Sequence, residues 1–125
     1  MRTPIFWRVL LVDLALIVVF AAIGRRSHDE SGAAVGVLST AAPFLIGYAV
    51  TALATRLDRA PLSLVRAAIA WAPGIALGMV LRRVVFDRGT ASSFVIVAFV
   101  ATAVLLLGWR VIALLIGRAR RHASA

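Results

Sequence analysis

The chain has 125 residues, 62% of them hydrophobic, with a mean hydropathy of +1.00, so one small soluble core could not hide its apolar surface. Its basic residues are fourteen arginines against five acids, for a formal charge of +9. These arginines punctuate apolar segments instead of lining one polar face, which excludes nucleic acid as the expected partner and favours membrane lipids.

Four apolar segments are each long enough to cross the hydrocarbon as a helix, which takes about 20 residues. They cover residues 5–23, 33–54, 63–81 and 91–116, and a basic tail follows over 117–125. Asp13 inside the first segment, and arginines directly after it, predict a retained helix and not a cleaved signal peptide. The polar connectors are short, so the sequence predicts one all-α integral membrane domain, a four-helix bundle with up-down topology.

Arginine counts at the two ends of the spans predict the orientation. One end has nine arginines, namely Arg2, Arg8, Arg56, Arg59, Arg66, Arg110, Arg118, Arg120 and Arg121. The other end has five, namely Arg25, Arg26, Arg82, Arg83 and Arg88. Because cytoplasmic ends carry the excess of basic residues, we expect both termini in the cytoplasm and a multi-pass protein of the plasma membrane.

The first span carries an acid within the membrane. Asp13 lies about 10 Å deep, where an ionised carboxylate needs a cation or water. Arg66 and Arg110 are expected at a similar depth on neighbouring spans, whereas Arg8 is about 140° round the same helix and is a poorer partner. This intramembrane polar site has two interpretations, an ion or proton site and an interhelical salt bridge that fixes packing.

A second charged cluster follows the first span and is expected to face the connector after the third. Its members are Arg25, Arg26, Ser27, His28, Glu30, Arg82 and Arg83. Arginines at a membrane surface bind phosphate oxygens, so the cluster predicts an anion or headgroup site. The alternative is a set of solvated arginines paired with nearby acids.

The sequence offers little chemistry beyond these charges. A lone His28 beside acids lacks zinc-site spacing, so no metal is expected. No nucleophile and base occur at a sequence spacing that would indicate a catalytic pair, and the chain has no cysteine. We therefore expect a protein that is not an enzyme and needs no cofactor.

Small residues and prolines predict how the middle helices pack. Ala70, Gly74 and Gly78 recur every four residues on the third span, a spacing that lets helix backbones approach closely. Pro73, after Trp71, and Pro43 on the second span each remove a helical hydrogen bond and predict kinks. Two kinked helices indicate either a gated cavity or simply bent helices.

Four stretches together resemble a known family. They are "DLALIVVFAAIGRRSHDE", "AAPFLIGYAV", "WAPGIALGMVLRR" and "SSFVIVAFVATAVLLLGWR". This pattern is similar to domain of unknown function family 3054, a group of small bacterial and archaeal membrane proteins. The resemblance implies a four-helix integral membrane protein and implies no activity.

Two function classes remain from the sequence. The first is a small oligomeric transporter or channel for an anion or small solute, with Asp13, Arg66 and Arg110 lining the route. The second is a non-catalytic accessory or lipid-binding subunit of a larger membrane complex. Both classes predict membrane lipids as partners, and both predict a homo-oligomer or a larger assembly.

Overall fold

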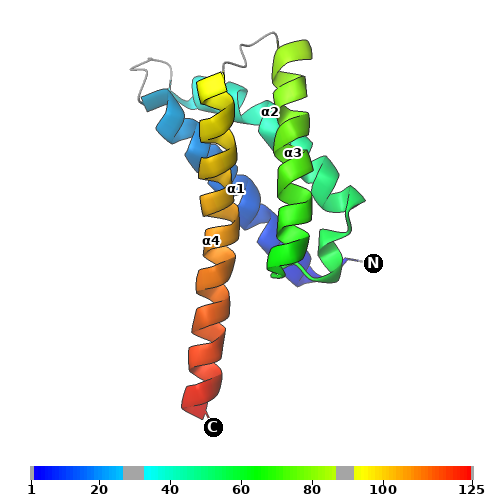
Figure 1. The fold of residues 1–125 in the computed structure, drawn as a ribbon, viewed down its shortest axis with the longest axis vertical. Coiled ribbons are helices and arrows are strands. Elements are labelled where there is room, and N and C mark those ends of the chain that lie inside the picture. The colour runs from blue at the N-terminus through cyan, green and yellow to red at the C-terminus, as the bar shows by residue number, and fades with distance from the viewer. Residues whose placement is uncertain (1, 27–32, 87–91, 125) are drawn as a thin grey trace.

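A computed structural model describes residues 2–26, 33–86 and 92–124, and within them the chain is helical with no strand (Figure 1). The elements are α1 (Pro4–Arg26), α2 (Ala33–Ala54), the short 3-10 helix η1 (Leu57–Arg59), α3 (Leu64–Val84) and α4 (Ser92–Ser124). All four long helices are apolar enough to cross a membrane. The predicted all-α membrane fold with four helices is therefore confirmed.

Consecutive helices run in opposite directions, and both ends of the described chain lie toward the bottom of Figure 1. Helix α1 packs against α2 and α4, and α3 packs against the same two helices. Short connectors set this arrangement, because they join only neighbouring helix ends. Ser63 starts α3 as its N-cap, since its side-chain oxygen accepts a hydrogen bond from the backbone N–H of Arg66.

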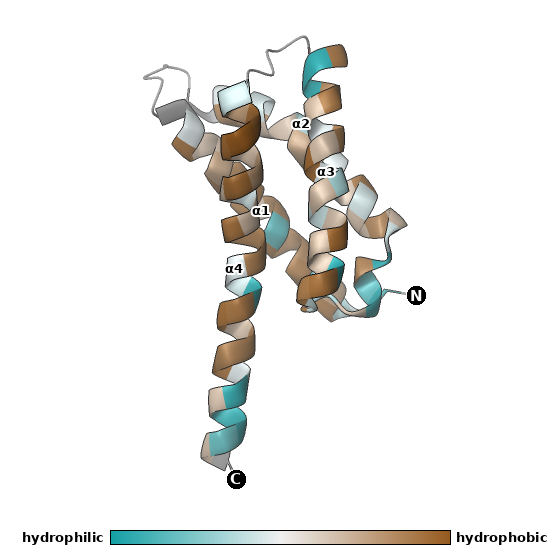
Figure 2. Ribbon diagram, viewed as in Figure 1, coloured by the Kyte–Doolittle hydropathy of each residue, from teal (hydrophilic) through white to brown (hydrophobic). Residues whose placement is uncertain are grey.

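Helix α4 is longer than predicted from hydropathy. It continues through the basic tail to Ser124, because most of the tail residues are arginine and alanine, which favour helix. Its 33 residues give roughly 50 Å of helix, against roughly 32 Å for the 21 residues of α3. The last turns of α4 project below the other helices, apolar at first and hydrophilic at the end (Figure 2).

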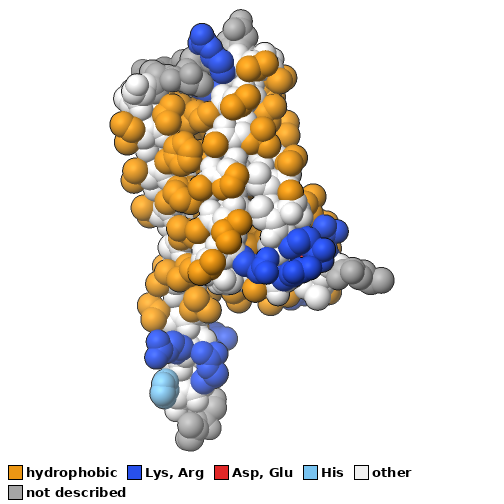
Figure 3. Space-filling view, turned by 45° about the vertical axis from the view of Figure 1, so that its right-hand side comes forward, with side chains coloured by type: hydrophobic (Ala, Val, Ile, Leu, Met, Phe, Trp, Pro, Cys, Tyr) orange, Lys and Arg blue, Asp and Glu red, His pale blue; other side chains and the backbone are white. Residues whose placement is uncertain are grey.

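The outer surface of the bundle is apolar. Large aliphatic side chains are exposed on every helix, as shown by Leu11 (68%), Val35 (80%), Val65 (70%) and Val104 (66%). Orange apolar side chains are spread over much of the face in Figure 3, and arginines gather at its top, at the lower right of the bundle and near the end of the projecting helix. Such a surface matches hydrocarbon and not water, as expected for a membrane protein.

Helices α2 and α3 approach closely through three glycines. A Cβ added at Gly47 would stand 2.5 Å from the carbonyl oxygen of Gly74 and 2.7 Å from the amide nitrogen of Gly78. The Thr51 hydroxyl adds a hydrogen bond of 2.8 Å to the carbonyl of Ala70. The small-residue stripe of α3 thus packs against α2 within the chain.

Both prolines lie inside helices that continue past them. Pro43 is fully buried in α2, and Pro73 is exposed in α3. Near Pro43, the Ser39 hydroxyl donates to the carbonyl of Gly36, at 3.2 Å. This bond stays within α2 one turn before Pro43, and it satisfies the Ser39 hydroxyl in a segment where hydrocarbon offers no partner.

Aromatic rings fill the upper half of the bundle. Phe20 of α1, Phe44 of α2 and Phe94 of α4 contact one another, with ring centroids 6.1 to 6.4 Å apart. Lower down, the indole N–H of Trp71 donates to the Thr102 hydroxyl, at 2.9 Å, and joins α3 to α4. These contacts join α1, α2 and α4 in the upper half and α3 to α4 below it.

We expect Gly47→Ala to lower the free energy of unfolding by about 1–3 kcal/mol, because its methyl group would overlap the α3 backbone. Gly108→Ala is the matched control, since a Cβ at Gly108 meets nothing within 4 Å. Denaturant titration of both variants in detergent micelles measures the difference. Equal stabilities would contradict the close α2–α3 contact.

Candidate functional site

The polar centre of the bundle is the carboxylate of Asp13, which α1 directs inward and which is fully buried. Arg110 of α4 binds it with both terminal nitrogens, Nη1 to Oδ1 at 2.8 Å and Nη2 to Oδ2 at 2.6 Å. The Tyr48 hydroxyl donates to Oδ2 at 2.6 Å, and the Trp109 indole N–H donates to Oδ1 at 2.8 Å. Each carboxylate oxygen therefore accepts two hydrogen bonds.

Each nitrogen of the Arg110 guanidinium donates at least one hydrogen bond. Its Nε donates to the carbonyl of Pro61 at 2.9 Å, and its Nη1 also donates to the carbonyl of Leu106 at 2.8 Å. Arg110 is 0% exposed, and its charge lies 5.1 Å from the ring centroid of Trp109. No buried side-chain nitrogen or oxygen in the described ranges lacks a hydrogen-bond partner.

These contacts join four parts of the fold at one point. Asp13 comes from α1, Tyr48 from α2, Arg110 from α4, and Pro61 from the connector that precedes α3. An isolated charge in hydrocarbon is costly, so each of these parts stabilises the position of the others. We call Asp13, Tyr48, Trp109 and Arg110 the buried ionic cluster.

The other two candidate cations of this site lie elsewhere. Arg66 donates to the carbonyls of Thr55 and Arg56, at 3.2 and 3.0 Å, and so satisfies the end of α2. Arg8 is exposed on α1. Of the three arginines considered as partners of Asp13, the structure brings only Arg110 into contact with it.

Sequence reasoning missed Tyr48 and Trp109. Their signal was available, because a phenol or an indole within a span must place its polar hydrogen on an acceptor. Asp13 was the acid expected within the spans, and a carboxylate can accept several hydrogen bonds. It was therefore the natural acceptor for both of these donors.

The predicted outer cluster falls mostly outside the described residues. Ser27, His28 and Glu30 lie outside them, and Arg25 and Arg26 end α1 with side chains that are also outside. The remaining two members lie on the last turn of α3. The guanidinium of Arg82 stands 4.1 Å from the ring centroid of Phe94, and Arg83 is exposed. Across the described ranges, no cluster of His, Cys, Asp and Glu could hold a metal ion.

A smaller ion pair orders the connector between α2 and α3. Asp58 accepts hydrogen bonds from Nε and Nη2 of Arg56, at 3.2 and 3.3 Å, and Arg2 lies 3.9 Å away. Arg56 adopts a left-handed backbone conformation, with φ 59°, which ends α2. The hydrogen bonds from Arg56 lower the pKa of Asp58, so this contribution to stability is present at neutral pH and is lost as pH falls through that pKa.

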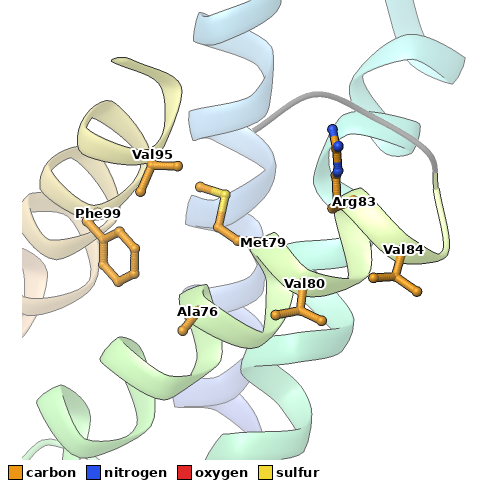
Figure 4. Close-up of a pocket in the computed structure, with 7 residues that line it drawn as sticks. All are labelled: Ala76, Met79, Val80, Arg83, Val84, Val95 and Phe99. Carbon is orange, nitrogen blue, oxygen red and sulfur yellow. The ribbon is translucent and has the colours of Figure 1, made fainter. Parts of the chain in front are cut away.

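A groove of about 410 Å³ opens between the second half of α3 and the first half of α4 (Figure 4). Its lining residues are Ala76, Met79, Val80, Arg83 and Val84 of α3 and Val95 and Phe99 of α4. Apart from Arg83, every lining side chain is apolar. The groove is open at the surface and is separate from the buried ionic cluster.

Comparison with known proteins finds a family match. The model of a family described as "Protein of unknown function (DUF3054)" matches residues 10–113, a range that contains the whole buried ionic cluster. No curated protein and no solved structure matches the chain.

We expect Arg110→Lys to destabilise the protein by about 2 kcal/mol, although it keeps the positive charge. A single ammonium cannot replace both bonds to Asp13 together with the bonds to the carbonyls of Pro61 and Leu106. Thermal and denaturant unfolding of the purified protein measure the loss. Arg59→Lys, at an exposed position, is the control and should change stability little. A lysine variant as stable as the wild type would contradict the geometry.

Proposed function

The chain belongs to the family of proteins of unknown function DUF3054, and because that name assigns no activity, we propose from the structure that it is a non-catalytic, lipid-binding multi-pass protein of the plasma membrane. The observation that carries this proposal is the unbalanced positive charge at the two ends of an apolar bundle. If each of the five acids neutralised one of the fourteen arginines, nine positive charges would remain.

The acids in the described residues are already engaged with arginine. Asp13 is bound by Arg110, and Asp58 is bound by Arg56. Exposed arginines at the end of the bundle that holds the α2–α3 connector include Arg8 and Arg59. A basic residue at a membrane surface contributes about 1 kcal/mol to the attraction of anionic lipids, so the charge distribution supports lipid phosphate as the ligand.

The buried ionic cluster supports a structural role for the one intramembrane acid. Its carboxylate oxygens and guanidinium nitrogens are all engaged within the protein, and Asp13 and Arg110 are both 0% exposed. A catalytic or transported group would need access to this carboxylate, and its four donors occupy that space. The binding function therefore belongs to the surface of the bundle.

The orientation proposed from the arginine count fits this role. With both termini in the cytoplasm, the helical end of α4 carries Arg118 and Arg121 to the inner leaflet. The aliphatic side chains before them, such as Ile112 (60% exposed) and Leu115 (57% exposed), lie past the connector, because Arg110 contacts Pro61 there. A helix end that is apolar and then basic suits the boundary between acyl chains and headgroups.

We expect the purified protein to bind phosphatidylglycerol about fivefold or more tightly than phosphatidylcholine. Mass spectrometry of the intact protein, released from detergent after titration with each lipid, measures both affinities. Raising the salt concentration should reduce the preference, because the attraction to the headgroup is screened. Equal affinity for the two lipids at low salt would refute lipid recognition by the arginines.

Transport is the second candidate function, and the observation that favours it is an ionisable pair within the membrane spans. It requires the buried ionic cluster to open to water. Our proposal instead expects liposomes containing the wild-type protein to show no more flux of protons, anions or cations than empty liposomes. Flux that Asp13→Asn abolishes in a protein that remains folded would replace our proposal with transport.

A further inference from the structure

We propose that the groove between α3 and α4 binds one acyl chain of an anionic phospholipid, whose headgroup phosphate is held by Arg83. This site deepens the lipid-binding function proposed above and rests on it. We refer to it as the α3–α4 groove, with the lining residues shown in Figure 4.

The walls of the α3–α4 groove suit a hydrocarbon chain. Ala76, Val80 and Met79 of α3 face Val95 and Phe99 of α4 across a volume of about 410 Å³. The thioether of methionine adapts its shape to irregular apolar ligands. One wall is held firmly, because the ring of Phe99 packs edge-on against the indole of Trp71 on α3, with centroids 5.9 Å apart. The groove is thus formed by the fold itself.

The position of Arg83 matches the position of a headgroup. It lies three residues after Val80 and four after Met79, so it shares their face of α3 about one turn nearer the helix end. Helix α3 ends at Val84, at the end of its membrane span. An acyl chain along the groove would therefore bring its phosphate to the level of this guanidinium.

The charge at this level is positive and complementary to phosphate. Arg83 is exposed, and no carboxylate in the described ranges pairs with it. Its neighbour Arg82 lies over the ring of Phe94, which brings a second positive charge to the same end of the groove. A guanidinium binds phosphate with two parallel hydrogen bonds. In a zwitterionic headgroup the neighbouring cation offsets part of this attraction, so an anionic headgroup is favoured.

A phospholipid uses both parts of this site, which is why we choose it over other anions. A free phosphate ion would contact Arg83 and leave the apolar walls unfilled. A neutral acyl chain would fill the groove but would leave Arg83 without a counter-charge. Only a ligand with a long apolar chain and an anionic head matches the whole set of lining side chains.

The test is a titration of full-length protein in detergent with phosphatidylglycerol, in which mass spectrometry of the intact protein resolves the first bound lipid. Arg83→Gln removes the charge, and Val80→Trp fills the groove at a position that is 55% exposed. We expect each to weaken the first binding step by about tenfold. Val65→Trp and Val104→Trp are matched controls at exposed positions outside the groove, and they should keep that step unchanged.

The outcomes separate this site from the broader function. If wild-type protein prefers phosphatidylglycerol but the groove variants bind it as the controls do, the α3–α4 groove is not the site, and the lipid-binding function stands. If wild-type protein shows no preference, both proposals fail. Displacement of the bound lipid by inorganic phosphate at equal concentration would show that the acyl chain contributes nothing, and it would overturn the groove. Circular dichroism establishes that each variant remains folded.

Discussion

The arrangement of this protein depends on one buried ion pair, that between Asp13 and Arg110. An acid in the middle of a membrane helix is unfavourable unless a cation and hydrogen-bond donors reach it. Here the donors come from α1's neighbours on both sides, and Arg110 also binds the carbonyl of Pro61 in the connector before α3. The pair therefore fixes the mutual positions of α1, α2, α4 and the connector in one half of the bundle.

The other half of the bundle is held by aromatic packing and by close contact between helix backbones. Phenylalanine rings from α1, α2 and α4 pack together, and close backbone approach through glycine joins α2 to α3. Lipid supplies no hydrophobic driving force between helices, so packing and hydrogen bonds must hold them. Within the described residues, the α3–α4 groove and the exposed arginines are the features that suit a ligand. This division between a structural interior and a binding surface is the basis of our proposal.

The sequence was sufficient to predict the fold, because four apolar segments of membrane length admit few other arrangements. It was insufficient to identify the partners of Asp13, since Arg66 and Arg110 are expected at the same depth in the membrane and depth alone cannot distinguish them. Arg66 lies in the first turn of α3, where the carbonyls at the end of α2 are nearer. Gly47 was also missed, because it stands apart from Gly36, the other glycine of α2, and its role shows only when α3 is packed against it. The α3–α4 groove depends on two helices and has no signal in either alone.

The most direct test of the central claim is a double-mutant cycle between Asp13→Asn and Arg110→Gln, with the free energy of unfolding measured for the wild type, both single variants and the double variant. If the pair holds the bundle together, each single variant loses about 3 kcal/mol or more, and the double variant loses far less than their sum. Losses that add to within about 0.5 kcal/mol would show that the two residues act independently, and they would contradict the account.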